Sequence, residues 1–302
     1  MTLPSITVAI CTRDRARHLR AALGSVMRQT MPADRFEVLV IDNGSRDETP
    51  AVVRSFGARV RGLHEPIAGL SRARNHALGR AASPLIAYLD DDAVAEPGWL
   101  AALLARFESD GAIGSVGGRT LPAFESPPPR WLHPDLLLCL SVVDWCAEPC
   151  ELRAPRFLVG ANMAFRTAPV RVAGGFRTDL GRVGRNLLSG EEQDLVDRLE
   201  AAGHRTWYEP AATVHHHIPT ERMTRRWLLA RARGQGATDA VRGSPGDLGG
   251  ARGALRTAAA ALVHPDPRQR FFARFRLALH ARYRQTRRRL VSERNGVVVP
   301  ND

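Results

Sequence analysis

Residues 85–92 read Leu-Ile-Ala-Tyr-Leu-Asp-Asp-Asp, an apolar run followed directly by three carboxylates. The apolar part predicts a buried strand, and the aspartates mark its end. Like charges this close repel each other, so a chain tolerates them at such a place mainly when a divalent cation and its phosphate ligand neutralise them. The alternative is an acidic turn that caps the helix expected from Trp99 to Phe107, because aspartates complement a helix dipole.

Strand-like and helix-like runs alternate around this stretch. We expect short strands at 6–11, 36–41, 59–63 and 85–89, and amphipathic helices at 15–29, 48–56 and 71–82. This alternation predicts an α/β fold whose mostly parallel sheet has helices on both faces. Ligands of such sheets bind at the carboxyl ends of the strands. Polar clusters lie at three of these ends: Thr12-Arg13-Asp14, Asp42-Asn43-Gly44-Ser45 and Asp90-Asp91-Asp92.

Length and composition are those of an ordinary folded domain. The 302 residues, 44% of them hydrophobic, suit one large domain or one domain with an appendage. No apolar run reaches the roughly 18 residues of a membrane-spanning helix, and the first residues do not resemble a secretory signal. We therefore expect a cytoplasmic protein. Cys139, Cys146 and Cys150 lack a paired metal spacing, so free thiols are expected rather than a zinc site.

The charge is concentrated at one end of the chain. Residues 222–302 hold 18 Arg against 5 Asp and Glu, whereas residues 1–221 hold 25 against 26, and every basic residue counted as Lys or Arg is arginine. The sequence therefore predicts a nearly neutral domain over 1–221 and a basic appendage over 222–302.

Ordered motifs over residues 5–217 resemble family 2 glycosyltransferases. Val40–Thr49, Gly69–Leu78 and Leu89–Asp92 are similar to the nucleotide-sugar-binding half, here residues 1–118, and Gly160–Arg166, Gly174–Phe176 and Gly190–Leu195 to the acceptor half, here 119–221. The resemblance implies the GT-A fold, a Rossmann-like, mostly parallel sheet with flanking helices. It also implies metal-dependent transfer of one sugar from a nucleotide diphosphate sugar to an acceptor hydroxyl, usually with inversion.

The resemblance assigns residues to the donor site. Asp42 matches the carboxylate that binds the base, although an Asx-turn is the alternative for this residue. Asp92 matches the ligand of Mn2+ or Mg2+, with Asp90 and Asp91 toward the ribose and the metal. Arg13 stands where many relatives have an aromatic residue, and a guanidinium also stacks on a base. The other residues assigned to nucleotide-sugar binding are Thr12, Asp14, Arg74, Asn75 and Asn162.

The catalytic base is expected at the start of a helix near residue 191. Glu192 falls where the family places this base, and Glu191 and Asp194 are its rivals. The structural alternative is that these carboxylates only complement the dipole of a helix capped by Ser189. A further metal ligand is expected from the run His215-His216-His217, where we favour His215 because an imidazole can complete a shell of carboxylates.

Two regions are expected to contact the acceptor or a membrane. The segment 120–156, with Trp131 and Trp145, either stacks on sugars or closes the core as a hydrophobic flap. Helices are expected at 222–233 and 268–290. The second carries Phe271, Phe275 and Leu279 at helical spacing, which suits peripheral attachment to an anionic membrane surface at the inner face of the cell membrane; the alternative is packing on the catalytic domain.

Two other functions fit the sequence less well. A GT-A-like nucleotidyltransferase needs a glycine-rich basic loop after the first strand, and Cys11–Arg15 is not one. A non-enzymatic membrane or nucleic-acid adaptor would use residues 222–302 but leave the acidic motifs without a purpose. The sequence therefore favours a glycosyltransferase in glycan, glycolipid or natural-product biosynthesis. Its acceptor is expected to be a saccharide, a lipid-linked group or a small molecule, and nucleic acid is not an expected partner.

Overall fold

The computed structural model describes residues 5–184, 186–244 and 250–294, and the chain forms two compact units. Unit 1 comprises Met1–Ala123, Ser141–Asp179 and Glu191–His217, and unit 2 comprises Phe124–Leu140, Leu180–Gly190 and Ile218–Asp302. Two segments that the sequence analysis placed in the domain 1–221, namely 124–140 and 180–190, thus belong to unit 2. None of the helices in the described ranges combines the length and hydropathy needed to cross a bilayer.

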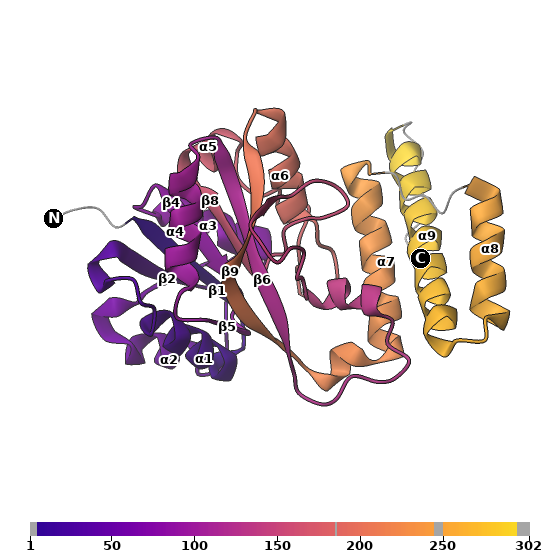
Figure 1. Ribbon diagram of the computed structural model, residues 1–302, viewed down its shortest axis with the longest axis horizontal. Coiled ribbons are helices and arrows are strands. Elements are labelled where there is room, and N and C mark those ends of the chain that lie inside the picture. The colour runs from indigo at the N-terminus through magenta and orange to yellow at the C-terminus, as the bar shows by residue number, and fades with distance from the viewer. Residues whose placement is uncertain (1–4, 185, 245–249, 295–302) are drawn as a thin grey trace. The chain divides into compact units, whose positions relative to one another are not determined.

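Unit 1 is built on one twisted sheet (Figure 1). Its strands, within the described residues, are β1 (Ile6–Thr12), β2 (Phe36–Asp42), β3 (Arg61–His64), β4 (Leu85–Leu89), β5 (Ala93–Ala95), β6 (Ile113–Phe124), β7 (Cys150–Glu151), β8 (Asn162–Arg166) and β9 (Arg205–Ile218). Their order is β3-β2-β1-β4-β8-β6-β9-β5, with β7 paired to β9. The first four in this order are parallel, and β8 joins β4 antiparallel.

Helices cover both faces of this sheet, as the sequence predicts. They are α1 (Ala16–Met27), α2 (Thr49–Ser55), α3 (Leu70–Arg80), α4 (Trp99–Ser109), α5 (Thr167–Val172) and α6 (Glu191–Ala201), with short 3-10 turns at Ala33–Arg35 and Gly57–Arg59. One core contains Val8 and Val40 and buries α1, α2 and α4; the other contains Ala9 and Ile41 and buries α3, α5 and α6. Neighbouring residues of a strand point to opposite faces, so continuous apolar strands fill two cores.

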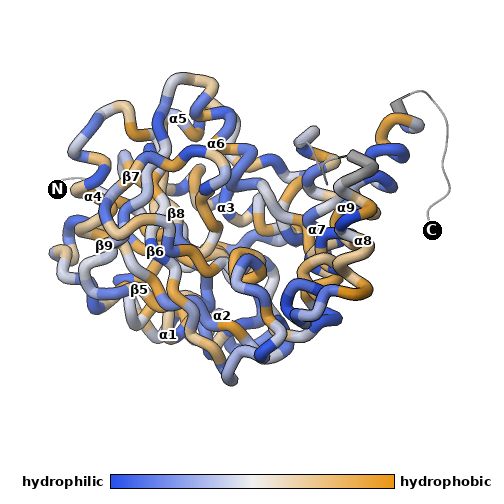
Figure 2. The backbone as a smooth tube through the Cα atoms, turned by 45° about the vertical axis from the view of Figure 1, so that its right-hand side comes forward, coloured by the Kyte–Doolittle hydropathy of each residue, from blue (hydrophilic) through white to orange (hydrophobic). Residues whose placement is uncertain are grey.

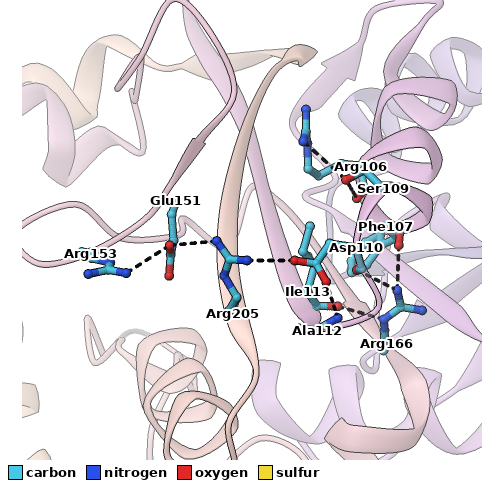
Figure 3. A network of polar contacts seen from close by, with 10 residues as sticks. All are labelled: Arg106, Phe107, Ser109, Asp110, Ala112, Ile113, Glu151, Arg153, Arg166 and Arg205. Atoms are coloured by element: carbon cyan, nitrogen blue, oxygen red, sulfur yellow. Dashed lines mark hydrogen bonds and ion pairs between the residues drawn. The ribbon is translucent and has the colours of Figure 1, made fainter.

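Arginines fix the edge of unit 1 where α4 meets β6 and β9 (Figure 3). Arg166 donates to the backbone oxygens of Phe107 and Ile113, at the end of α4 and the start of β6. Arg205 pairs with Asp110 and Glu151, which joins β9 to the α4–β6 turn and to β7. Such pairs are partly exposed and individually weak, so their role is to hold these segments in register.

Unit 2 contains three long helices, α7 (Arg225–Arg242), α8 (Gly250–Val263) and α9 (Pro267–Arg294), together with 3-10 turns at Pro134–Leu140 and Thr220–Met223. In this unit α9 lies between α7 and α8 (Figure 1). The helix α7 is longer than the helix expected at 222–233. It continues to Arg242 through Gly236, where a Cβ would lie 2.1 Å from the backbone oxygen of Leu279. The absence of a side chain at Gly236 therefore lets two helix backbones approach closely.

The three apolar residues of α9 that the sequence assigns to a membrane do not face outward. Phe271 and Phe275 are buried in unit 2, and Leu279 is half-buried. Phe271 packs against Trp131 with ring centroids 4.8 Å apart. This corrects the expectation that Phe271 and Phe275 are presented to a membrane, because α7 and the segment 124–140 occupy that face within the unit. Packing within unit 2 therefore buries the apolar stripe that is visible in the sequence.

The segment 141–157 is held by its own contacts in unit 1. Trp145 donates its Nε1 proton to the oxygen of Phe157 and packs on that ring, so it serves the flap predicted as the alternative to sugar stacking. Cys146 and Cys150 form a disulfide, which differs from the expected free thiols. Cys150 also pairs with Tyr208 in the sheet, so the disulfide ties the chain at Cys146 to the strand β7.

Candidate active site

The carboxyl ends of the parallel strands meet at one edge of the sheet of unit 1. Thr12 is in register with Asp42, and Asp42 with His64, so the polar clusters that follow β1, β2 and β4 converge there. The side chain of Asn43 connects the loop after β2 to the segment between β3 and α3, since it donates to the oxygens of Glu65 and Ile67 and accepts from the N–H of Gly69. The parallel register therefore brings the polar clusters at these strand ends to one edge of the sheet, as the alternation of strands and helices predicts.

Asp42 and the residues after β1 form the outer part of this edge. One oxygen of Asp42 accepts from the N–H of Ser45 at 2.8 Å, which is the Asx-turn considered for this residue. Asp14, at a positive φ of 53°, accepts from the N–H of Arg46 at 2.6 Å and thereby ties the first loop to the second. Arg13 is exposed beside Asp14. The turn fixes Asp42 at the strand end and leaves its second oxygen outside this hydrogen bond.

The three aspartates form a tight turn between β4 and β5, closed by a hydrogen bond from the N–H of Ala93 to the oxygen of Asp90. Asp91 points inward and accepts from the hydroxyl of Thr12 at 2.6 Å. Burial, together with the charge of Asp92, raises the pKa of Asp91 to about 7. Thr12 and Asp91 thus act as a buried support for the turn, while Asp90 and Asp92 flank it.

An imidazole completes this cluster, and it belongs to His216. Its Nε2 lies 3.2 Å from Oδ1 of Asp92, and both side chains are almost fully buried. Asp90, Asp92 and His216 each offer a ligand atom within 4.8 Å of the other two. The antiparallel pairing of β5 with β9, in which Ala93 faces His216, brings this histidine to the acidic turn.

The structure places His215 elsewhere. Its side chain is half exposed, and its Nε2 lies 3.1 Å from the carboxylate of Glu96. Adjacent residues of a strand point to opposite faces, so only one of these two histidines can reach Asp92. The choice of His215 from sequence is thereby corrected to His216. In the sequence, the alternation of Val214, His216 and Ile218 identifies His216 as the histidine on the buried face of this strand.

Arg15 is a second residue that the sequence analysis did not select. Its guanidinium donates to Asp92 and lies 3.5 Å from Asp91. Although burial works against its charge, the neighbouring aspartates raise the pKa of Arg15 above its ordinary value, so it remains a cation. Arg15 therefore places a positive charge beside the acidic turn. Nothing in the spacing after β1 distinguishes this arginine from Arg13.

Arg74 connects the acidic turn to the start of α6. It is buried, donates to Glu191 at 2.6 Å and lies 3.7 Å from Asp90. Its guanidinium lies over the ring of Phe176 and in the space left by the missing Cβ of Gly160. The predicted donor-site residue Arg74 is therefore the electrostatic link between the two groups of carboxylates.

The carboxylates of α6 have different environments. Burial, and next the charge of Glu192, raises the pKa of Glu191 to about 7. Glu191 and Glu192 each have a buried carboxylate oxygen without a hydrogen-bond partner among the described residues. Asp194 instead is held by Arg177 at 3.1 Å and by Arg198 at 2.9 Å. Asp194 forms ion pairs with two arginines, and Glu191 forms one with Arg74. Of the three candidates for the base, Glu192 therefore has the carboxylate with the fewest contacts to arginine.

Two predicted donor-site residues have structural contacts instead. Asn162 is completely buried, accepts from Trp99 Nε1 and donates to the backbone oxygens of Arg119 and Ala212. Asn75 donates to and accepts from the backbone of Phe176, where Gly175 at φ 71° allows the close approach. Both N–H groups and the oxygen of the Asn162 amide bind the protein, so we correct Asn162 to a positioning role. Asn75 also holds the backbone of Phe176, through one N–H group and its oxygen.

Comparison with known proteins agrees with this geometry. The model of the family described as glycosyl transferase family 2 matches residues 7–167, more than half of the chain. A glucosyl-dolichyl phosphate glucuronosyltransferase of Haloferax volcanii is 26% identical over 242 residues, covering 78% of this chain and 76% of that protein. The succinoglycan biosynthesis protein ExoM of Rhizobium meliloti is 27% identical over 293 residues, covering 91% and 90%.

Solved structures share the fold. The mannosyltransferase PcManGT of Pyrobaculum calidifontis, in complex with GDP-Man and Mn2+, superposes with a TM-score of 0.59 at 19% identity and covers 99% of this chain and 78% of its own. TarS of S. aureus, residues 1–349 with UDP-GlcNAc, also gives a TM-score of 0.59, at 16% identity and coverages of 99% and 94%. The expected GT-A fold is confirmed. The chain therefore belongs to glycosyl transferase family 2 and is a glycosyltransferase.

Proposed function

We propose that this enzyme transfers one sugar from a nucleotide diphosphate sugar to an acceptor hydroxyl, with a divalent cation and with inversion at the anomeric carbon. The observation that carries the proposal is the cluster of Asp90, Asp92 and His216, which Arg74 links to the carboxylates of α6. The neighbours that contain GDP-Man with Mn2+ and UDP-GlcNAc support this class of donor.

The donor set of the cluster fits Mn2+ or Mg2+. Two carboxylates and one imidazole are accepted ligands of Mn2+, and carboxylates are those of Mg2+. Asp90, Asp92 and His216 would hold the ion, and Asp91 would support the turn through Thr12. When bound, such an ion neutralises the charge that develops on the departing diphosphate.

The residues of the chain supply the other requirements of the reaction. Asp42, fixed by its Asx-turn, accepts a hydrogen bond from the base of the donor. The acceptor oxygen forms its bond to the anomeric carbon while the bond from that carbon to the phosphate oxygen breaks, and the electron pair leaves with the nucleoside diphosphate. Glu192 takes the hydroxyl proton. Burial, and next the charge of Glu192, raises the pKa of the adjacent Glu191 to about 7, so Glu191 is partly protonated near neutral pH.

The test is a screen of nucleotide sugars for thermal stabilisation in the presence of Mn2+, since a ligand of the folded state raises the melting temperature by mass action. The identified donor should then stabilise the wild type but not Asp92→Ala. The matched control is Asp34→Ala, which removes an exposed carboxylate and should respond like the wild type. Metal-dependent donor binding by Asp92→Ala would contradict the proposed site.

The stereochemical part has its own measurement. The anomeric configuration of the product, read by NMR, should be opposite to that of the donor, because a single displacement inverts the carbon. A retained configuration would exclude Glu192 as a simple base in one step.

A further inference from the structure

The helix α8 presents an exposed apolar face in unit 2. Leu255, Leu262 and Val263 are 71%, 74% and 76% exposed, and they account for three of the seven large hydrophobic side chains that are exposed among the described residues. Leu255 and Leu262 are seven residues apart, so they lie on one side of the helix, and Val263 adjoins Leu262. We call these three residues the α8 surface. Single exposed apolar residues are common, but a row of them on one helix marks an interaction site.

This face is not required for packing within unit 2. The opposite side of α8 carries Thr257 and Ala261, which are 7% and 4% exposed, and α8 packs against α9. The hydrophobic run 258–263 can be followed along α8 in Figure 2. The helix is therefore held by one side, and the α8 surface is exposed to water.

Two arginines lie at the carboxyl end of α8, and a third lines the same cavity. Arg270 donates to the backbone oxygen of His264 and Arg274 to that of Ala261, which places both guanidinium groups at the carboxyl end of α8. Together with Arg225 they line a cavity of about 220 Å³, which we call the arginine cavity. No carboxylate lines it, and in the described part of the chain none of the three arginines forms an ion pair with a carboxylate.

Arg225 joins the cavity to the core of unit 2. Its guanidinium lies 5.0 Å from the ring centre of Trp131 and 5.8 Å from that of Phe271. Stacking on two rings fixes the group and leaves its N–H donors directed away from the aromatic faces. A fixed guanidinium with two others beside it is an arrangement that binds a phosphate oxygen with little further loss of side-chain entropy.

We propose that the α8 surface and the arginine cavity together bind an anionic lipid bilayer. The three apolar side chains enter the interface, and the arginines of the cavity bind the phosphate of a lipid headgroup. A second copy of this chain is a poorer partner for the same face, because it would bring arginine against arginine in a region, residues 222–302, that carries 18 Arg and 5 Asp and Glu. The proposal goes beyond glycosyl transfer and requires neither donor nor acceptor.

The two components differ in their response to salt. Each arginine near an anionic membrane contributes about 1 kcal/mol to the binding free energy, roughly fivefold in affinity. At about 0.1 M salt this attraction is screened beyond about 10 Å from the charge. Insertion of apolar side chains is not screened. Binding should therefore weaken with increasing salt but not disappear.

The experiment is cosedimentation of the full chain with phosphatidylcholine vesicles containing about a third phosphatidylglycerol. We expect the wild type to bind these vesicles and to bind vesicles of phosphatidylcholine alone more weakly, through the apolar component only. The triple variant Leu255→Ser, Leu262→Ser, Val263→Ser should bind about tenfold or more weakly and lose its binding at high salt. The double variant Arg270→Gln, Arg274→Gln should bind about 25-fold more weakly at low salt and depend less on salt.

A matched control removes two charges from another exposed place. Arg284→Gln with Arg288→Gln, on the solvent side of α9, should bind about as well as the wild type if the arginine cavity is the site. Because Arg270 and Arg274 also hold the end of α8, Arg225→Gln serves as a second variant, and melting temperatures establish that each variant is folded. The Arg225→Gln variant should weaken vesicle binding about fivefold.

Three results would overturn the proposal. They are absence of binding by the wild type, unchanged binding by the serine variant, and an equal loss in the Arg284 and Arg288 control. A wild type that dimerises through this face, while the serine variant is monomeric in sedimentation velocity, would also overturn it. Because donor binding is measured separately, failure here leaves the proposed transferase activity intact.

Discussion

Replacing His216 by alanine should weaken Mn2+ binding by at least about ten- to a hundredfold, whereas His215→Ala should leave it unchanged. The side chain of His216 is 2% exposed and its Nε2 lies 3.2 Å from Asp92, so alanine removes a buried candidate ligand from the acidic turn. Even the partners of metal ligands are worth about 10–100-fold in metal affinity, which corresponds to about 1.4–2.8 kcal/mol. His215 faces Glu96 at the surface, and its loss breaks a contact worth about 0–1 kcal/mol.

Isothermal titration of Mn2+ into each variant, with and without nucleoside diphosphate, measures this difference. A thermal melt in the absence of metal separates loss of the ligand from loss of folding, and His216→Asn, which retains a polar group, serves as a milder variant. Equal losses in the His215 and His216 variants, or normal affinity in His216→Ala, would refute the assignment. The neighbouring histidine is a close control because it differs only in the face of β9 on which it lies.

Three further changes test other parts of the structure. Glu192→Gln should lower single-turnover rates by about 10²–10⁴ with donor affinity retained, and a greater loss in Asp194→Asn would transfer the role of base. Gly236→Ala should lower the free energy of unfolding by about 1–3 kcal/mol in urea, since its Cβ would lie 2.1 Å from a backbone oxygen of α9; Gly79→Ala, with open space around it, should not. Because burial raises the pKa of Glu191 from 4.5 to about 7, the folded state binds the proton more tightly, so stability should fall as pH rises across that range; Glu191→Gln should flatten the profile, and an unchanged slope would contradict it.

The strands β1 to β4 and the helices α1 to α4 of unit 1 follow closely from the sequence. The expected strand 6–11 is Ile6–Thr12, and the expected helix 71–82 is Leu70–Arg80. Local periodicity suffices here because each run is either apolar throughout or amphipathic over several turns. The position of the acidic turn also follows, since the carboxyl ends of parallel strands must share an edge.

The roles of individual polar residues did not follow from their motifs. Asn75 and Asn162 occupy positions that resemble the family pattern, yet their amides bind backbone groups from distant segments. Arg15 lies on Asp92 although 77 residues separate them. A hydrogen bond depends on where two atoms lie in three dimensions, and the order of residues restricts such long-range distances only weakly.

The sequence by itself determined the α/β architecture, the acidic turn after β4 and the family, because these depend on periodicity and on ordered local motifs. Tertiary structure decided which histidine reaches Asp92, since the register of β5 with β9 selects one face of the strand. It also decided which apolar residues of the C-terminal region remain exposed. Phe271 and Phe275 have the spacing of a membrane-binding stripe, but they are buried within unit 2. Among the described residues of this region, the exposed large apolar side chains are Leu255, Leu262 and Val263 on α8 and Val291 on α9. Hydrophobic burial depends on which helices meet, and that is a property of the packed unit rather than of any single segment.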